Sequence, residues 1–387
     1  MLASRLIDLH ESSTIAVLDR VGVLEKGGEK IVKLSVGEPS FNTPEFIKAA
    51  AIDALMNNET RYSNSRGIIE LRRALCEYYN KKYAISLDPA KNILITPGGK
   101  QAIFYNVLAL VQEGDEVLIP APAWGSFAEI VKMAGGIPIE VACRKEDNFA
   151  VSTALIQKFI TPKTKLLIIN SPNNPTGKII PAETFKALYK LCVDNEVLML
   201  SDEIYDCIVF KEFDHFSLLS IADSLQHGAV VNGFSKLYAM TGWRLGYIIA
   251  DEMVIDAMLK IQQNSATCPV TFVQKGGLAA LLKDTDNFPQ QSLRIYQENR
   301  DYLVDAFSSM KNFSLIAPDG GFYALIDVAK VSKDATEFSM LLLNTYKIAV
   351  VPGAAFGESC MGFIRVSFAT NRQDLVYFVK VLKENFE

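Results

Sequence analysis

The feature of this sequence that most restricts its fold is a series of short runs that are apolar throughout. Residues 93–96 read I-L-I-T, and the series continues at 116–120 (E-V-L-I-P), 165–170 (K-L-L-I-I-N), 197–201 (V-L-M-L-S) and 228–233 (G-A-V-V-N-G). A strand with one face in water alternates apolar and polar residues, whereas a strand buried on both faces is apolar along its length. The pattern therefore predicts a mainly parallel sheet that is covered by helices.

Stretches with helical spacing separate these runs. One follows the Gly-Gly pair at 98–99, another begins at about Pro181, and a third begins at about Glu252, after a further strand expected over 243–250. This alternation predicts an α/β architecture. After about Asp286 the pattern changes to a long helical stretch, a hairpin and a last strand over 363–369, which indicates a smaller α+β domain.

Composition excludes several classes of function. The 39 Lys and Arg residues against 44 Asp and Glu residues lack the basic surplus of a general nucleic-acid binder. Six cysteines without a C-x-x-C pair and three unpaired histidines argue against a metal site and a Ser-His-Asp triad. The first apolar stretch contains acids, and no apolar run approaches the ~18 residues of a membrane span. We therefore expect a soluble, cytoplasmic protein with reduced thiols and neither a membrane nor a nucleic acid as partner.

Lys236 is the first residue that indicates chemistry, because it follows the buried run 228–233 among small and aromatic residues. A partly desolvated lysine is available as a nucleophile for Schiff-base chemistry, although a lone lysine more often reaches solvent. Ser235 and Arg244 lie nearby in the sequence. A hydroxyl and a guanidinium beside a lysine suit a phosphate monoester.

Polar residues follow two other buried runs. Asp202 comes directly after 197–201, where its carboxylate needs a partner such as a cationic ring nitrogen; a helix N-cap is the alternative. Tyr205 adds a phenol on the same side if the segment is helical. Asn174, in the loop S-P-N-N-P-T-G, either forms part of a simple turn or presents its amide to a ring substituent.

Two further loops complete the set. Gly99 and Lys100 stand at a predicted helix N-terminus, whose exposed N–H groups favour an anion. Trp124 follows another strand and either packs in the core or stacks on a flat ligand. Together these residues predict one ligand, a flat, phosphorylated pyridine that carries an aldehyde, which is pyridoxal 5'-phosphate.

At this point the sequence resembles the class I/II aminotransferases, which are pyridoxal-phosphate enzymes of fold type I. The motifs N-S-P-N-N-P-T-G, S-D-E-I-Y and F-S-K-L-Y-A-M-T-G-W-R-L-G-Y occur in this order, and the resemblance covers essentially the whole chain. It implies that Lys236 is the Schiff-base lysine and base, that Asp202 holds the pyridine nitrogen, and that Tyr205 and Asn174 contact the ring hydroxyl. It also implies a stacking Trp124, and a phosphate cradle formed by Ser235, Arg244, Gly99 and Lys100.

The resemblance assigns the substrate carboxylate to Arg365 and to the backbone of Gly37. It implies a homodimer in which Tyr62 reaches the phosphate of the other subunit. The expected fold is α/β, with a large domain built on a mainly parallel seven-stranded sheet. The large domain is expected over 46–286, and the small domain over 1–45 and 287–387.

The G-G-K-Q loop resembles the aspartate aminotransferase branch, subgroup I-gamma, in which a lysine at the place of Lys100 meets the distal carboxylate of an acidic substrate. Thr14 lies in a stretch similar to the amino-terminal segment that folds over the site in that branch. The residues before Gly67 depart from many relatives, and Arg66 is either a surface residue or an influence on substrate choice.

The leading hypothesis is a transaminase that moves the amino group of an acidic, aspartate-like L-amino acid to a 2-oxo acid such as 2-oxoglutarate. The first alternative is another pyridoxal-phosphate reaction, namely elimination, cyclisation or oxidation of a specialised amino acid, which the same lysine and aspartate would serve. A binding module without activity and a nicotinamide-dependent enzyme are further alternatives; no G-x-G-x-x-G follows the first strand.

Overall fold

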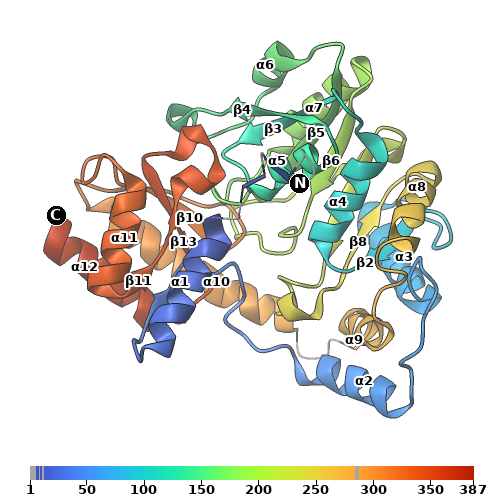
Figure 1. Ribbon diagram of the computed structural model, residues 1–387, viewed down its shortest axis with the longest axis horizontal. Coiled ribbons are helices and arrows are strands. Elements are labelled where there is room, and N and C mark those ends of the chain that lie inside the picture. Colours follow the sequence, from blue (N-terminus) through green and yellow to red (C-terminus); the bar gives the residue numbers. More distant parts are fainter. Residues whose placement is uncertain (1–5, 8, 11–12, 284–286) are drawn as a thin grey trace.

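The computed structural model describes residues 6–7, 9–10, 13–283 and 287–387, with the backbone alone described for 13–16. Its main element is a seven-stranded sheet with the order β2-β8-β7-β6-β5-β3-β4 (Figure 1). The strands are β2 (Ile93–Thr96), β3 (Glu116–Ala121), β4 (Ile137–Ala142), β5 (Thr164–Asn170), β6 (Leu198–Asp202), β7 (Gly228–Gly233) and β8 (Gly246–Ile249).

Neighbouring strands from β4 to β7 pair in parallel, and β8 pairs antiparallel with both β7 and β2. The predicted mainly parallel sheet is therefore confirmed. The strand expected over 243–250 is shorter at both ends, since β8 covers only Gly246–Ile249. Before it begins, Thr241–Trp243 forms a 3-10 turn.

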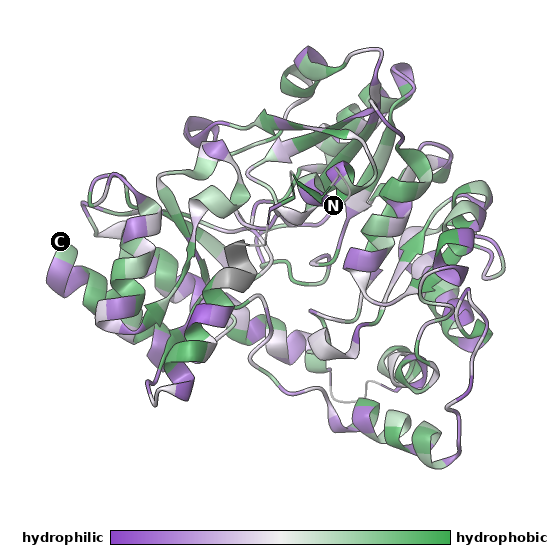
Figure 2. Cartoon of the chain, viewed as in Figure 1, coloured by the Kyte–Doolittle hydropathy of each residue, from purple (hydrophilic) through white to green (hydrophobic). Residues whose placement is uncertain are grey.

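Both faces of this sheet are covered, as the apolar runs predicted. In β5, Leu166 and Ile168 pack toward helices α4 (Gly99–Leu110), α5 (Ser126–Met133) and α8 (Glu252–Gln263). Leu167 and Ile169 pack toward the other side, into the cluster formed with α2 (Glu45–Met56), α3 (Ile69–Tyr83), α7 (Ala182–Asp194) and α9 (Thr271–Leu282). Figure 2 shows the result as apolar strands inside helices that are polar on their outer faces.

A second group of elements comes from both ends of the chain. The four-stranded sheet has the order β12-β13-β10-β9, with β9 (Ser314–Ile316), β10 (Tyr323–Asp327), β12 (Val351–Pro352) and β13 (Phe363–Ser367). The short strands β1 (Val32–Lys33) and β11 (Ile348–Ala349) pair in parallel. Helices α10 (Phe288–Ser308), α11 (Ala335–Tyr346) and α12 (Arg372–Phe386) accompany these strands, and α1 (Ser13–Lys26) lies beside them (Figure 1). The domain division expected from the sequence, together with its boundaries, stays a prediction.

The sheet topology determines where polar residues gather. Strands β5, β6 and β7 are parallel, so Asn170, Asp202 and Gly233 end them at one edge of the sheet. Because β8 runs the opposite way, it begins at that same edge, with Gly246 opposite Gly233 and opposite Thr96 of β2. In open α/β sheets this carboxyl edge is where ligands bind.

Candidate active site

A cleft of about 850 Å³ lies at this edge, and its walls come from the seven-stranded sheet, the four-stranded sheet and α1. Most of the predicted functional residues line it: Gly37, Gly99, Lys100, Trp124, Asn174, Asp202, Tyr205, Ser235, Lys236, Arg244 and Arg365. They come from segments that are far apart in the sequence. The topology described above therefore brings together what the motifs indicated separately.

Lys236 lies three residues beyond the end of β7 and is half-buried. Its Nζ donates to the carbonyl oxygen of Gly37 at 2.5 Å and lies 5.8 Å from the ring centre of Phe322. A Cβ on residue 37 would lie 2.5 Å from the Tyr323 hydroxyl, so any larger residue here would have to displace the end of that side chain. The neighbouring Ser235 is buried.

Asp202 is the last residue of β6 and is 5% exposed. Its Oδ1 accepts a hydrogen bond from the backbone N–H of Ile204 at 3.2 Å, but turns and no helix follow, so the helix N-cap alternative is not realised. Burial raises the pKa of this carboxyl to about 7; the adjacent Glu203 charge adds to the rise, while the Ile204 bond and Lys236 oppose it. A cationic partner that enters the cleft would stabilise the ionised form of this buried carboxyl.

Tyr205 and Asn174 flank Asp202 in the cleft. The helical spacing considered for Tyr205 is not realised, because the chain after Glu203 forms consecutive turns. The Tyr205 hydroxyl nevertheless donates to the Tyr323 hydroxyl at 3.4 Å, and burial raises its pKa well above the usual range. The Asn174 N–H donates to Asn170 Oδ1 at 2.8 Å, so the end of β5 fixes the loop.

A cradle for an anion forms where α4 begins. The first N–H groups of a helix lack partners within the helix and, with its dipole, favour negative charge. Gly98 precedes α4 with a φ of 89°, and a Cβ there would lie 2.4 Å from Arg244 Nη2. Arg244 Nη1 donates to the Thr241 carbonyl at 2.9 Å. These contacts hold the guanidinium against the helix N-terminus.

Arg365 of β13 forms the opposite wall and is 2% exposed. Its Nη1 donates to Asn174 Oδ1 at 3.1 Å and its Nη2 donates to the Ser35 carbonyl at 2.8 Å. The Tyr323 ring centre lies 4.2 Å from the guanidinium carbon. Nε is buried and has no hydrogen-bond partner in the described part of the chain. Burial lowers the pKa of this guanidinium, and it remains a fixed, partly unsatisfied cation.

Lys100 is the second residue of α4, and its Nζ lies 4.6 Å from the ring centre of Trp124. Although the residue is exposed, partial desolvation in the cleft and then the Arg244 charge lower its pKa. Trp124 also packs edge-on against Phe127 at 5.4 Å. Trp124 therefore lines the cleft and also packs against Phe127, and its stacking on a flat ligand stays a prediction.

Two predicted residues do not take part in the cleft of this single chain. Tyr62 is 86% exposed, and it is absent from the cleft lining. The side chain of Thr14 lies outside the described part of the structure. Arg66, which the sequence left open, pairs with Asp256 at 2.6 Å and donates to the Lys91 carbonyl at 3.4 Å. It thus binds to the surface of its own chain.

Sequence reasoning missed three contributors to the site. Asn170 ends β5 as Asp202 ends β6, so the rule that selected Asp202 would have selected it too. Tyr323 lies in β10 and Ser35 just before Gly37, and their proximity to Arg365 depends on the packing of distant segments. Within the described residues, no cluster of His, Cys, Asp and Glu is arranged to hold a metal ion. No described helix is both long and apolar enough to cross a membrane.

The geometry fits pyridoxal 5'-phosphate. Lys236 offers an amine to an aldehyde, and the buried Asp202 suits a ring cation. The cradle of Gly98, Gly99 and Arg244 suits a phosphate, because residue 98 leaves space that a Cβ would fill. A lysine, a buried aspartate and an anion cradle at the carboxyl edge of an open α/β sheet define the pyridoxal-phosphate enzymes of fold type I.

Comparison with known proteins specifies the class. Residues 29–382 match the family Aminotransferase class I and II, and the chain belongs to this family. Its cofactor is accordingly pyridoxal 5'-phosphate, and it is a transaminase.

Similar curated proteins cover nearly the full chain. An aromatic-amino-acid aminotransferase 2 from Thermococcus litoralis is 38% identical over 93% of this chain and 94% of its own length. An aspartate/prephenate aminotransferase from Thermus thermophilus is 37% identical over 97% of this chain and 96% of its own. Among solved structures, an aspartate aminotransferase from Thermus thermophilus with maleate has a TM-score of 0.93 at 36% identity, covering 99% of this chain and 100% of that one. The predicted fold and enzyme class are thus confirmed.

Proposed function

We propose that this transaminase moves the amino group of an acidic, aspartate-like L-amino acid to a 2-oxo acid such as 2-oxoglutarate. The observation that carries the proposal is that Arg365 and Lys100 line one cleft, in addition to the anion cradle and Lys236. The remaining lysine of the lining, Lys33, is already paired with Glu25 at 2.8 Å. Two cations suit a substrate with two carboxylates. Relatives named aspartate aminotransferase and aspartate/prephenate aminotransferase support this choice.

In this proposal Arg365 binds the α-carboxylate. Its guanidinium forms a planar fork that matches a carboxylate with two parallel hydrogen bonds. The hydrogen bonds to Asn174 and Ser35 hold the fork in place before substrate arrives. The backbone of Gly37 lies beside the same carboxylate. Lys100, and Thr14 from α1, meet the distal end of the substrate.

Pyridoxal 5'-phosphate, when bound, supplies an aldehyde for the amino group and a cationic ring that stabilises negative charge on the substrate carbon. Asp202 stays ionised toward the ring nitrogen, and Tyr205 and Asn174 bind the ring hydroxyl. Trp124 stacks on the ring, while Ser235, Arg244, and the N–H groups of Gly99 and Lys100 hold the phosphate.

Lys236 acts as the base that takes the proton from the substrate Cα at its Nζ. Proton transfer by a positioned side chain contributes typically 10²–10⁴-fold to the rate. The hydrogen bond from Nζ to the Gly37 carbonyl supports this role, because it orients the amine within the cleft beside the proposed carboxylate site. We also propose that residues 1–45 with 287–387 form one domain and residues 46–286 the other.

Aromatic L-amino acids are a second candidate substrate class. The lining of the cleft includes the apolar residues Leu18, Val21 and Ile103 as well as Lys100. An apolar wall accepts a side chain that carries no charge, and one relative is named an aromatic-amino-acid aminotransferase. The two candidates share Arg365 and differ only at the distal end.

We further propose a cytoplasmic homodimer. The exposure of Tyr62, together with the exposed apolar Val270 and Leu282, supports a partner subunit on this face, with Tyr62 reaching the partner's phosphate. All six cysteines are free, in keeping with a reducing compartment.

The test is spectroscopic. The purified enzyme is mixed separately with L-aspartate, L-phenylalanine, L-alanine and L-arginine, and the yellow band of the lysine-bound cofactor is followed. We expect aspartate to bleach the band and 2-oxoglutarate to restore it. Bleaching with phenylalanine but not aspartate would select the aromatic class, and bleaching without recovery by any 2-oxo acid would contradict transamination.

A further inference from the structure

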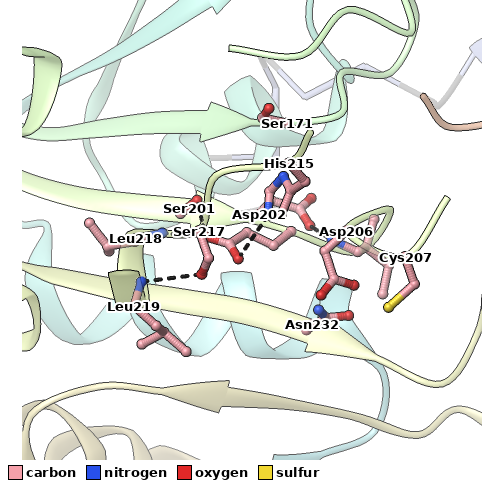
Figure 3. A network of polar contacts seen from close by, with 12 residues as sticks. Ser171, Ser201, Asp202, Asp206, Cys207, His215, Ser217, Leu218, Leu219 and Asn232 are labelled. Carbon is pink, nitrogen blue, oxygen red and sulfur yellow. Dashed lines mark hydrogen bonds and ion pairs between the residues drawn. The ribbon is translucent and has the colours of Figure 1, made fainter. Parts of the chain in front are cut away.

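Behind the active site, the side chains of Glu203, Asp206 and His215 are buried together beside Lys82, whose side chain is 32% exposed. These four residues form what we call the buried charge cluster. Glu203 is 0% exposed and directly follows Asp202 in the chain. Asp206 is also buried, and the His215 side chain is 4% exposed. Figure 3 shows His215, Asp206 and Asp202 around the end of the same strand.

The Glu203 carboxylate is fully buried and makes three polar contacts. Its Oε1 accepts hydrogen bonds from the Ser201 hydroxyl and the Leu218 N–H, both at 2.9 Å. Its Oε2 lies 3.2 Å from His215 Nε2. Hydrogen bonds to the charged form of a carboxylate favour that form. Figure 3 labels Ser201, Leu218 and His215, the residues that make these contacts.

The other members of the buried charge cluster balance the Glu203 charge only in part. Lys82 Nζ pairs with Asp206 at 3.1 Å, so one carboxylate of the cluster has its own cation. Although burial alone would raise the pKa of Asp206, the Lys82 charge and next the His215 charge lower it. Within the cluster the Glu203 charge is therefore left for His215 to balance. Burial opposes a charge on His215, but the hydrogen bond and charge of Glu203, and then Asp206, raise its pKa overall.

We propose that the Glu203–His215 ion pair is a positioning element for the reaction, in which protonated His215 offsets the Glu203 charge so that Asp202 stays ionised toward the cofactor ring. The inference rests on the proposed role of Asp202. Without the His215 charge, the buried charge cluster carries one net negative charge directly behind Asp202. A nearby like charge disfavours a second carboxylate anion, so the proton shared with the ring nitrogen moves toward Asp202.

The first test uses the cofactor-free protein and does not depend on the reaction. The chain has three histidines, and loss of one set of ring signals in His215→Gln assigns His215 by NMR. We expect its titration midpoint above 6.5, and a fall of about one unit or more in Glu203→Gln. A midpoint at or below 6.5 that Glu203→Gln does not move would overturn the inference.

The second test separates charge from hydrogen bonding. His215→Gln retains a side-chain N–H for Glu203 but removes the charge, and the double variant Glu203→Gln/His215→Gln restores the charge balance. Each variant is reconstituted with pyridoxal 5'-phosphate labelled with ¹⁵N in the ring. In His215→Gln we expect the ring signal to move toward the unprotonated position and kcat to fall about tenfold, the effect of one pKa unit. In the double variant we expect both to recover.

His227→Gln is the matched control, because His227 directly precedes β7 at the end opposite the cleft, where its carbonyl accepts from Met199 N–H at 2.8 Å. It should leave the ring signal and kcat unchanged. A wild-type ring signal in His215→Gln, or a double variant as impaired as His215→Gln, would contradict the charge role. Failure of aspartate to bleach the wild-type enzyme would instead refute the proposed substrate and leave the His215 titration readable.

Discussion

Replacement of Arg365 by lysine tests the carboxylate site at its most constrained residue. Arg365 is buried, donates to Asn174 and Ser35 at 3.1 and 2.8 Å, and lies against the Tyr323 ring. Lysine keeps the charge but has one nitrogen instead of a planar fork. That nitrogen cannot satisfy both Asn174 and Ser35 and also present two parallel hydrogen bonds to a substrate carboxylate.

The expected decrease in kcat/KM follows from the number of hydrogen bonds that the substrate carboxylate loses. Arg365→Lys removes at least one of two charge-assisted hydrogen bonds to the carboxylate, and such a bond contributes about 1.5–3 kcal/mol. At 1.36 kcal/mol per factor of ten, kcat/KM for L-aspartate should fall roughly ten- to 150-fold. The position of the cofactor band should not change, because Arg365 is proposed to bind substrate and not the ring.

The assay is the steady-state rate with L-aspartate and 2-oxoglutarate, supported by thermal unfolding of each variant. Arg294→Lys is the control, since Arg294 is exposed on α10 and pairs with Glu298 on the surface of that helix. Its kcat/KM should match the wild type. A folded Arg365→Lys variant with kcat/KM within threefold of the wild type would refute the proposal that the Arg365 guanidinium binds the substrate carboxylate through two parallel hydrogen bonds.

Four other outcomes follow from the site. Asp202→Asn should bind cofactor but lose most of its kcat, and full activity in that variant would reject the ring-nitrogen role. Lys100→Ala should lower kcat/KM for aspartate more than for alanine, since the Nζ beside Trp124 is proposed to bind the distal carboxylate; an unchanged aspartate/alanine ratio would contradict it. Lys236→Ala should reduce kcat at least ~100-fold, as measured by product formation. In the cofactor-free protein, the Asp202 pKa of about 7 exceeds its ordinary 3.8, so the folded state retains a proton that the unfolded chain releases. Asp202 should therefore cost stability increasingly as pH rises from about 4 to 7, and the Tm advantage of Asp202→Asn over wild type should grow across that window and level off above it.

The sequence predicted the sheet and the strand-end residues because both depend on local pattern. Fully apolar runs such as 165–170 need burial on both faces; Asp202 comes directly after such a run, and Lys236 lies three residues beyond another. The direction of β8 did not follow from its composition, because an apolar run reads the same in a parallel or an antiparallel strand. The length of chain between the strands did not determine the direction of β8 either.

Other parts of the site depend on contacts between distant segments. Tyr323 reaches Tyr205 and Arg365 only because the four-stranded sheet packs against the carboxyl edge of the larger one. Arg66 was ambiguous for the same reason, since its partner Asp256 lies on α8. The buried pair of Glu203 and His215 carries no sequence signal, because a lone histidine in a loop does not reveal what it faces.

The hydrogen bond from Arg365 to Ser35 also bears on how the enzyme matures during synthesis. Ser35 leaves the ribosome early and Arg365 almost last, whereas Gly99, Asp202, Lys236 and Arg244 all emerge well before the C-terminal segment. Domains generally fold as units, N-terminal parts first. In the proposed assignment, the residues that hold the cofactor are thus synthesised before the residue that binds the substrate carboxylate. We therefore expect a nascent chain to become able to hold cofactor before it can bind substrate.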